Sequence, residues 1–225
     1  MRAARAFVWL GGGMFVASLA YCAWWYLFRA GMDRPFAGAD PIAWDAALVM
    51  MFALHHSLFA RDAVKRRLAP LAGDAWRSGY VWAASLLLFA MCGLWRPVGG
   101  TFRDHHGVLA VVDVVIQLLG VRLIARSVST IDPLALAGIR PLPKGEKLQA
   151  VGPYRFVRHP LYLGWMVAVF GSPHLTGDRL AFAVLTSIYL VIAIPWEEQS
   201  LRAEFGEAYA RYAEEVRWRV IPFIY

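Results

Sequence analysis

The sequence is poor in cysteine and in charge. Its two cysteines, Cys22 and Cys92, lie in apolar runs and form no C-x-x-C motif, which argues against a disulfide framework or a thiol relay. Only 17% of its 225 residues are charged, and 59% are apolar, against roughly 45–50% in a soluble domain. This composition favours a membrane protein.

Histidine is also scarce, and its pattern argues against a metal-dependent membrane oxidase. The six histidines form two adjacent pairs and two single residues, and neighbours on a helix point about 100° apart. We therefore expect no metal. The sequence also lacks the repeated halves and paired broken helices that are usual in transporters. A membrane transporter or sensor nevertheless stays open as a non-enzyme alternative.

Six apolar runs reach or approach the ~20 residues that a helix needs to cross a bilayer. They cover residues 6–28, 41–60, 80–96, 107–126, 160–177 and 179–196. The sequence thus predicts an all-α, polytopic membrane helix bundle with five to six transmembrane helices. The simplest domain count is one membrane domain, residues 1–225, with a four-helix part at 1–130 and a second part at 131–225.

The net charge of +7 does not call for a nucleic-acid partner, because basic residues gather in the cytoplasmic loops of membrane proteins. With the N-terminus in the cytoplasm, all but five of the 23 Lys and Arg fall on the cytoplasmic side. The exceptions are Arg29, Arg34, Arg96, Arg103 and Arg179. This distribution predicts that both termini are cytoplasmic.

The fourth apolar run carries Asp113 and Gln117 at i and i+4, so the two side chains share one helix face. Polar groups in hydrocarbon normally face a bundle interior. Two interpretations stay open for Asp113, a functional or cavity-lining role and an interhelical hydrogen bond.

A cytoplasmic amphipathic helix is predicted to begin near Trp196, after the sixth run. Apolar residues recur there every three to four positions. They are Leu201, Phe205, Tyr209, Tyr212 and Val216. The chain then ends in a basic and aromatic tail, RWRVIPFIY, of a composition suited to the membrane interface.

The stretch GPYRFVRHPLYLGW (152–165) places Arg155, Arg158 and His159 directly before a helix that starts at Pro160. Cations at a helix N-terminus suit an anionic ligand group, and Gly164 lets a backbone or ligand approach closely. The acidic pair Glu197–Glu198 adds carboxylates at the same end of the bundle, which suits a zwitterionic ligand. The alternatives are contact of the cations with membrane lipid and an ordinary acidic first turn of the surface helix.

These residues carry a resemblance to a known family. GPYRFVRHPLYLGW, followed by EEQSLRAEFGEAYARY (197–212), resembles the integral-membrane methyltransferases of the isoprenylcysteine carboxyl methyltransferase superfamily. Further stretches resemble the bacterial methanethiol S-methyltransferases, which are related to the NnrU-type membrane proteins. These are LHHSLFARDAVKR (54–66), WRPVGG (95–100), IDPLALAGIRP (131–141) and SPHLTGDRLAFA (172–183).

The resemblance implies an S-adenosylmethionine site on the cytoplasmic side of a bacterial inner membrane. Carried over by position, it implies that backbone groups of 146–149 and a set of side chains hold the cofactor. With the neighbouring carboxylate included, the expected residues are Leu148, Gln149, Tyr154, His159, Pro160, Leu161, Tyr162, Glu197 and Glu198. The second part of the chain is then the cofactor-binding part.

The prenylcysteine enzymes carry an Arg on the substrate side where this chain has Ala193. This departure favours a small hydrophobic thiol such as methanethiol as the acceptor. The alternative is a prenylcysteine-like or lipid carboxylate, amine or thiol.

Methyl transfer from a sulfonium is an in-line displacement that needs no metal and no covalent enzyme intermediate. A thiol acceptor reacts as the thiolate, so a cationic site and a general base both help. The candidate catalytic residues are His55 as the base, Arg158 as part of the cationic site, and Glu197. His56 and His159 stay open as alternative bases, and packing is the alternative role for His55.

Overall fold

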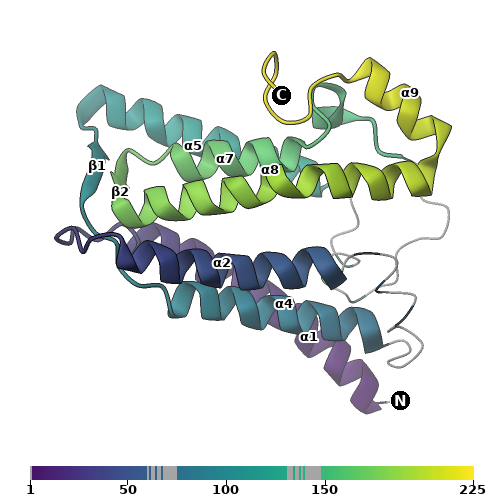
Figure 1. Cartoon of the computed structure of the whole chain (residues 1–225), viewed down its shortest axis with the longest axis horizontal. Helices are drawn as coiled ribbons and strands as arrows, with labels where there is room; N and C mark the ends of the chain where they lie inside the picture. Colours follow the sequence, from purple (N-terminus) through teal and green to yellow (C-terminus); the bar gives the residue numbers. More distant parts are fainter. Residues whose placement is uncertain are drawn as a thin grey trace. The chain divides into compact units, whose positions relative to one another are not determined.

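Helices dominate the computed structural model, which describes residues 2–59, 75–130 and 148–225 together with positions 61, 64, 67, 134, 137 and 139. These residues form two compact units (Figure 1). The first unit contains the helices up to Gly93, and the second contains the strands and the helices from Thr101 onward. The prediction that the whole chain is one domain stays a prediction.

The first unit consists of α1 (Arg2–Trp24), α2 (Asp40–Phe59) and α4 (Ala75–Gly93), with α4 packed against both other helices. α1 continues into one π-helical turn, η1 (Trp25–Arg29). Trp25 packs edge-on against Trp95, with ring centroids 5.2 Å apart. The backbone N–H of Arg96 donates to the buried carboxylate of Asp45 at 2.9 Å, which ties the segment after α4 to α2.

The second unit contains α5 (Gly107–Val128), α7 (Pro160–Phe170), α8 (Gly177–Phe205) and α9 (Glu207–Glu215), and α7 contacts both α5 and α8. α5 and α7 touch through glycine. A Cβ added at Gly164 would lie 2.9 Å from the carbonyl oxygen of Gly120, and one added at Gly120 would lie 2.5 Å from the backbone nitrogen of Ala168. The expected close backbone approach at Gly164 is therefore confirmed.

A two-stranded antiparallel sheet joins β1 (Thr101–Asp104) to β2 (His174–Thr176) at one end of the second unit (Figure 1). Two strands this short leave no periodic signal in the sequence. The Arg103 guanidinium donates from Nη2 to the carbonyls of Phe170 and Ser172 at 2.7 and 2.8 Å, which secures the link between α7 and β2.

Asp113 and Gln117 of the fourth apolar run have partners inside the second unit. The Gln117 amide donates to the Ala168 carbonyl at 3.0 Å, which joins α5 to α7. The buried carboxylate of Asp113 lies 2.6 Å from Nδ1 of His105 and 3.9 Å from Nε of Arg103. Asp113 therefore joins the start of α5 to the sheet.

The chain is an integral membrane protein, and four of the described helices are long and apolar enough to cross a bilayer. They cover Arg5–Arg29, Asp40–Phe59, Gly107–Val128 and Gly177–Phe205. The fifth predicted span, 160–177, was too long, because α7 ends at Phe170 after 11 residues. At 1.5 Å per residue a helix of that length covers about 16 Å, roughly half of the hydrocarbon core.

The predicted boundary near Trp196 was also wrong. α8 runs through Pro195 and both acidic residues to Phe205, and it ends at Gly206, which has a positive φ of 53°. The apolar face predicted for the amphipathic helix is confirmed. Tyr209, Tyr212 and Val216 form a buried cluster with Leu201 and Phe205 packed against it.

Candidate active site

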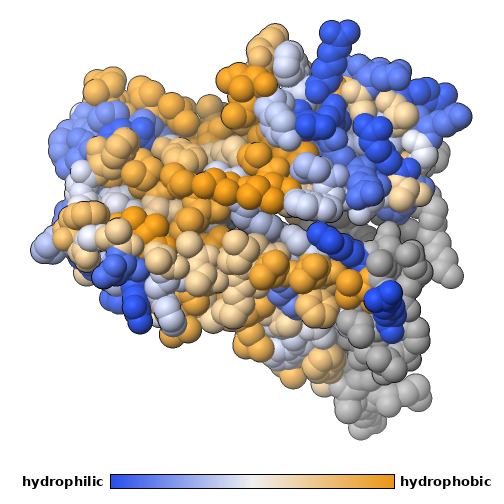
Figure 2. Space-filling model, in the orientation of Figure 1, coloured by the Kyte–Doolittle hydropathy of each residue, from blue (hydrophilic) through white to orange (hydrophobic). Residues whose placement is uncertain are grey.

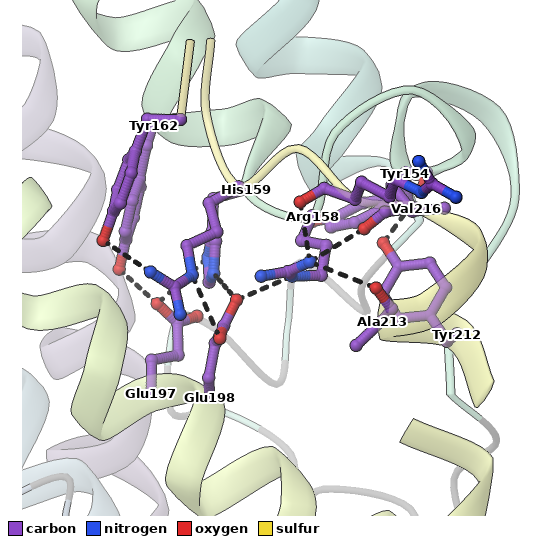
Figure 3. A network of polar contacts seen from close by, with 12 residues as sticks. Tyr154, Arg158, His159, Tyr162, Glu197, Glu198, Tyr212, Ala213 and Val216 are labelled. Atoms are coloured by element: carbon purple, nitrogen blue, oxygen red, sulfur yellow. Dashed lines mark hydrogen bonds and ion pairs between the residues drawn. The ribbon is translucent and has the colours of Figure 1, made fainter. Parts of the chain in front are cut away.

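The site is built where the segment before α7 meets the end of α8 and the C-terminal tail (Figure 3). Val151 precedes one 3-10 turn, η2 (Gly152–Arg155), and His159 lies directly before α7. Residues 148–159 form no α-helix, and residues 131–147 lie largely outside the described residues.

Backbone hydrogen bonds fix this segment against the tail. The N–H of Arg158 donates to the Trp218 carbonyl at 2.9 Å, and the N–H of His159 donates to the Arg219 carbonyl at 2.7 Å. The Tyr212 hydroxyl donates to the Tyr154 carbonyl at 2.8 Å, which adds a tie to α9. The tail is thus a structural part of the site.

The two acidic residues of α8 have different surroundings because adjacent helical positions point about 100° apart. The Glu198 side chain is only 5% exposed, whereas that of Glu197 is 43% exposed. In Figure 3 both carboxylates point toward His159 from the same stretch of α8. A ligand can therefore reach Glu197, while protein groups surround Glu198.

Glu198 is the centre of a buried ion-pair network. Its Oε1 lies 2.7 Å from Nε of Arg158, and its Oε2 lies 3.3 Å from Nε of Arg219. Arg158 also donates from Nη1 to the carbonyls of Val216 and Arg217, at 2.8 and 3.0 Å, just after α9. The network therefore joins α8, the segment before α7 and the end of α9.

Glu197 meets two aromatic side chains from the start of α7. The Tyr162 hydroxyl donates to Glu197 Oε2 at 2.5 Å, and Nδ1 of His159 lies 3.5 Å from the same oxygen. The His159 and Tyr162 rings stack with centroids 5.3 Å apart and an interplanar angle of 16°. One half-exposed carboxylate is thus held in place by a hydroxyl and an imidazole.

His159 is buried between both carboxylates of α8. Burial lowers the pKa of His159, but the hydrogen bonds and charges of Glu197 and Glu198 outweigh it, so that pKa lies above its ordinary value. Its Nε2 is buried 3.5 Å from Glu198 and makes no hydrogen bond of good geometry within the described residues. The two carboxylates therefore favour the protonated form of His159, in which Nε2 is a donor.

Tyr154 lies close to the carboxylate of Glu197. Burial and the charge of Glu197 raise the pKa of the Tyr154 hydroxyl, against the opposing effect of a hydrogen bond with Thr130. Tyr154 stays neutral at physiological pH and keeps a hydroxyl that can donate. A carboxylate, a cationic imidazole and tyrosine hydroxyls together fit the ammonium, carboxylate and ribose hydroxyls of S-adenosylmethionine.

The other predicted site residues differ in burial and in the groups that they contact. Leu148 packs against the cluster of Tyr209 and Tyr212, and Gln149 follows it, half-buried. Pro160 is buried and Leu161 half-buried in the first turn of α7. Glu146 and Lys147 lie outside the described residues.

His55, the predicted base, lies in α2 of the first unit. Its Nε2 lies 3.3 Å from the Tyr80 carbonyl oxygen, and its ring stacks on that of Tyr80 with centroids 5.2 Å apart. A carbonyl can only accept, so Nε2 carries the proton in the neutral ring and Nδ1 keeps its lone pair. The catalytic role of His55 stays a prediction.

Sequence reasoning missed Arg219 and the tail that carries it. The available signal was the alternation of Arg and aromatic residues in RWRVIPFIY, which we assigned to the membrane interface. The Arg219 guanidinium instead contacts Glu198, and its Nη1 donates to the Tyr225 hydroxyl at 3.0 Å. Only the fold brings this tail to the acidic pair.

The matching family model and two similar proteins found for this chain are methyltransferases. Residues 114–208 match the phospholipid methyltransferase family, a range that contains the whole of α7 and both acidic residues. Methanethiol S-methyltransferase 2 of Bradyrhizobium diazoefficiens is 33% identical over 180 residues, which cover 75% of this chain and 69% of that protein. The methanethiol S-methyltransferase of Crocosphaera subtropica is 34% identical over 194 residues, covering 80% and 74% of the two chains.

A more distant relative comes from an animal. Nurim of Sus scrofa is 28% identical over 179 residues, which cover 72% of this chain and 68% of that protein. No solved structure matches the chain.

Proposed function

Because the chain belongs to the membrane methyltransferase family that contains the methanethiol S-methyltransferases, we propose that it methylates methanethiol or a similarly small hydrophobic thiol. The enzyme depends on S-adenosylmethionine, and the product from methanethiol is dimethyl sulfide. The observation that carries the proposal is the half-exposed Glu197 carboxylate, held by Tyr162 and beside His159 within the matched range.

Glu197, Tyr162, His159 and Tyr154 are the residues that would hold the cofactor. Glu197 accepts from the ammonium or the ribose hydroxyls, and the hydroxyl of Tyr162 fixes the orientation of that carboxylate. The cationic His159 favours the cofactor's own carboxylate. When bound, S-adenosylmethionine supplies a methyl group on a positively charged sulfur.

The rest of the chemistry is positioning and proton removal. Alignment of the acceptor with the methyl group supplies several kcal/mol, and the apolar helices exclude water. His159 is a weaker candidate base, because the carboxylates of Glu197 and Glu198 favour its protonated form. His55 is the better candidate, since its Nδ1 keeps a lone pair that can take the thiol proton. Arg158 and Glu198 hold the site together through their buried ion pair.

Ala193 supports a small uncharged acceptor, because no cation stands at this position to bind an acceptor carboxylate. A lipid acceptor is the second candidate, and the match of residues 114–208 to the phospholipid methyltransferase family favours it. Analysis of volatile and lipid products separates the two.

We also propose that both termini and the cofactor site face the cytoplasm. The asymmetry of Lys and Arg supports this orientation. In Figure 2, hydrophobic side chains form a band along the first part of α8, and hydrophilic side chains cover its end and α9. This distribution supports a position outside the hydrocarbon for the end of α8 that carries Glu197.

Calorimetric titration of the detergent-purified protein with S-adenosylhomocysteine tests the cofactor assignment. We expect Glu197→Gln to weaken binding at least tenfold, about 1.4 kcal/mol, and Glu215→Gln, an exposed carboxylate in α9, to leave it unchanged. Equal affinity in the wild type and Glu197→Gln would remove Glu197 from the site. Failure of a folded, monodisperse wild type to bind would contradict the proposed cofactor.

A further inference from the structure

A cavity in the second unit borders the candidate active site at Pro160 and lies apart from the acidic side chains of that site. It has a volume of about 850 Å³ and opens between the end of α5, the turn η2, the start of α7 and the tail. Among the described residues, its lining includes none of Tyr162, Glu197 and Glu198. Its chemistry is therefore a separate question.

Three arginines line this cavity. Arg122 and Arg126 are one turn apart near the end of α5, and Arg155 ends η2. The described lining contains no carboxylate, and no ion pair joins these three arginines to a described acidic residue. Arg158 and Arg219 of the same unit, in contrast, are paired with Glu198. Three adjacent cations without a counter-charge favour an anionic ligand.

The rest of the lining is apolar. It consists of Leu123, Gly152, Pro153, Phe156, Val157, Pro160, Leu163 and Pro222. Arginine forks match phosphate geometry, and the apolar walls suit the glycerol and upper acyl chains beside such a headgroup. An amphipathic ligand fits this combination better than a free anion does.

The surroundings of the cavity are those of a membrane surface. Arg122 and Arg126 lie in the last two turns of α5, a candidate membrane span whose apolar side chains are mostly exposed. Phe156, Phe223 and Ile224 beside the cavity are 73%, 85% and 76% exposed. In Figure 2 hydrophobic side chains also gather over the C-terminal tail. A ligand can therefore enter from the lipid.

Phe223 supports this placement through its backbone. It is the one described non-glycine residue with a positive φ, at 68°, and this conformation is costly for a bulky side chain. The turn is closed by hydrogen bonds between Ile221 and Tyr225. The chain thus holds an aromatic ring outward, where a soluble protein would bury it, and a lipid surface accommodates it.

We propose that this cavity binds the phosphate of an anionic phospholipid from the adjoining leaflet, with Arg122, Arg126 and Arg155 as the phosphate ligands. The site is independent of methyl transfer. It anchors the end of α5, the turn η2 and the tail to one lipid molecule.

Native mass spectrometry of the full-length protein, with dioctanoyl phosphatidylglycerol added, tests the proposal. We expect one lipid per chain, bound at least tenfold more tightly than dioctanoyl phosphatidylcholine. Arg122→Gln/Arg126→Gln should weaken retention at least tenfold. Arg211→Gln/Arg217→Gln, which removes the same charge from exposed positions elsewhere in the unit, should not.

Three outcomes would overturn the proposal. Equal losses in the two double variants would mean unspecific attraction to charge. Displacement of the lipid by millimolar inorganic phosphate would mean a site for a free anion. Loss of S-adenosylhomocysteine affinity with unchanged lipid binding would mean that the arginines serve the cofactor. If the α5 double variant fails to fold, Arg155→Gln gives an independent test, and undiminished lipid retention there refutes the assignment.

Discussion

The ion pair between Arg158 and Glu198 is expected to be among the largest single contributions to the stability of the second unit. Both side chains are more than nine-tenths buried, and Arg158 also donates to two carbonyls after α9. Removing one member of such a pair leaves a buried charge and costs about 3–5 kcal/mol. Arg158→Met should therefore lower the stability by that amount.

Thermal unfolding of the detergent-purified protein, followed by tryptophan fluorescence, measures the effect. At about 2–4 °C per kcal/mol for a chain of this size, Arg158→Met should lower the Tm by roughly 6–20 °C. The double variant Arg158→Met/Glu198→Met should recover at least half of this loss, because it removes the buried carboxylate that the single variant leaves without Arg158. Arg217→Met, at an exposed position, is the control, with a change within about 0.5 kcal/mol.

Two results would refute this reasoning. A Tm of Arg158→Met within 2 °C of the wild type would mean that the pair contributes little. A double variant no more stable than the single variant would mean that the lost carbonyl contacts, and not the loss of Arg158 as a partner of Glu198, cause the destabilisation.

Three further predictions follow from the same contacts. Because the folded-state pKa of His159 is raised, its stabilising contribution is complete below its ordinary pKa of about 6.5 and is lost as the pH rises through the raised value. His159→Gln should therefore flatten the fall in Tm between pH 6 and 9, and an unchanged slope would contradict this. Gly164→Ala should cost about 1–3 kcal/mol by separating α5 from α7, whereas Gly13→Ala, with open space around it, should lower the Tm little; equal effects would contradict the close packing. His55→Gln should slow methyl transfer at least tenfold without changing the affinity for S-adenosylhomocysteine, and an unaltered rate would exclude His55 as the base.

The long spans could be predicted from the sequence because hydropathy over about twenty residues measures what a bilayer requires. The end of α8 could not be predicted, because the charged residues at 197 and 198 can lie inside a helix as well as at its boundary. Pro195 did not end the helix, and Gly206 did, through its positive φ. The length of α7 was overestimated because the predicted span 160–177 also included Gly171 and the residues of strand β2.

The candidate active site, too, could be predicted only in part from the sequence. The motif around His159 and the acidic pair point to a ligand, and the structure brings them together. The different surroundings of Glu197 and Glu198 could not be predicted from the sequence, because they depend on the directions in which these two adjacent side chains of α8 point. Arg219 was missed because its contact with Glu198 depends on the return of the tail.

Headspace gas chromatography is the most direct test of methyl transfer to a small thiol by this protein. The purified enzyme is incubated with methanethiol and S-adenosylmethionine that carries a deuterated methyl group. We predict deuterated dimethyl sulfide in proportion to the wild-type enzyme, and at least tenfold less with Glu197→Gln at limiting cofactor. A folded wild-type protein that binds S-adenosylhomocysteine but forms no labelled dimethyl sulfide would contradict the claim.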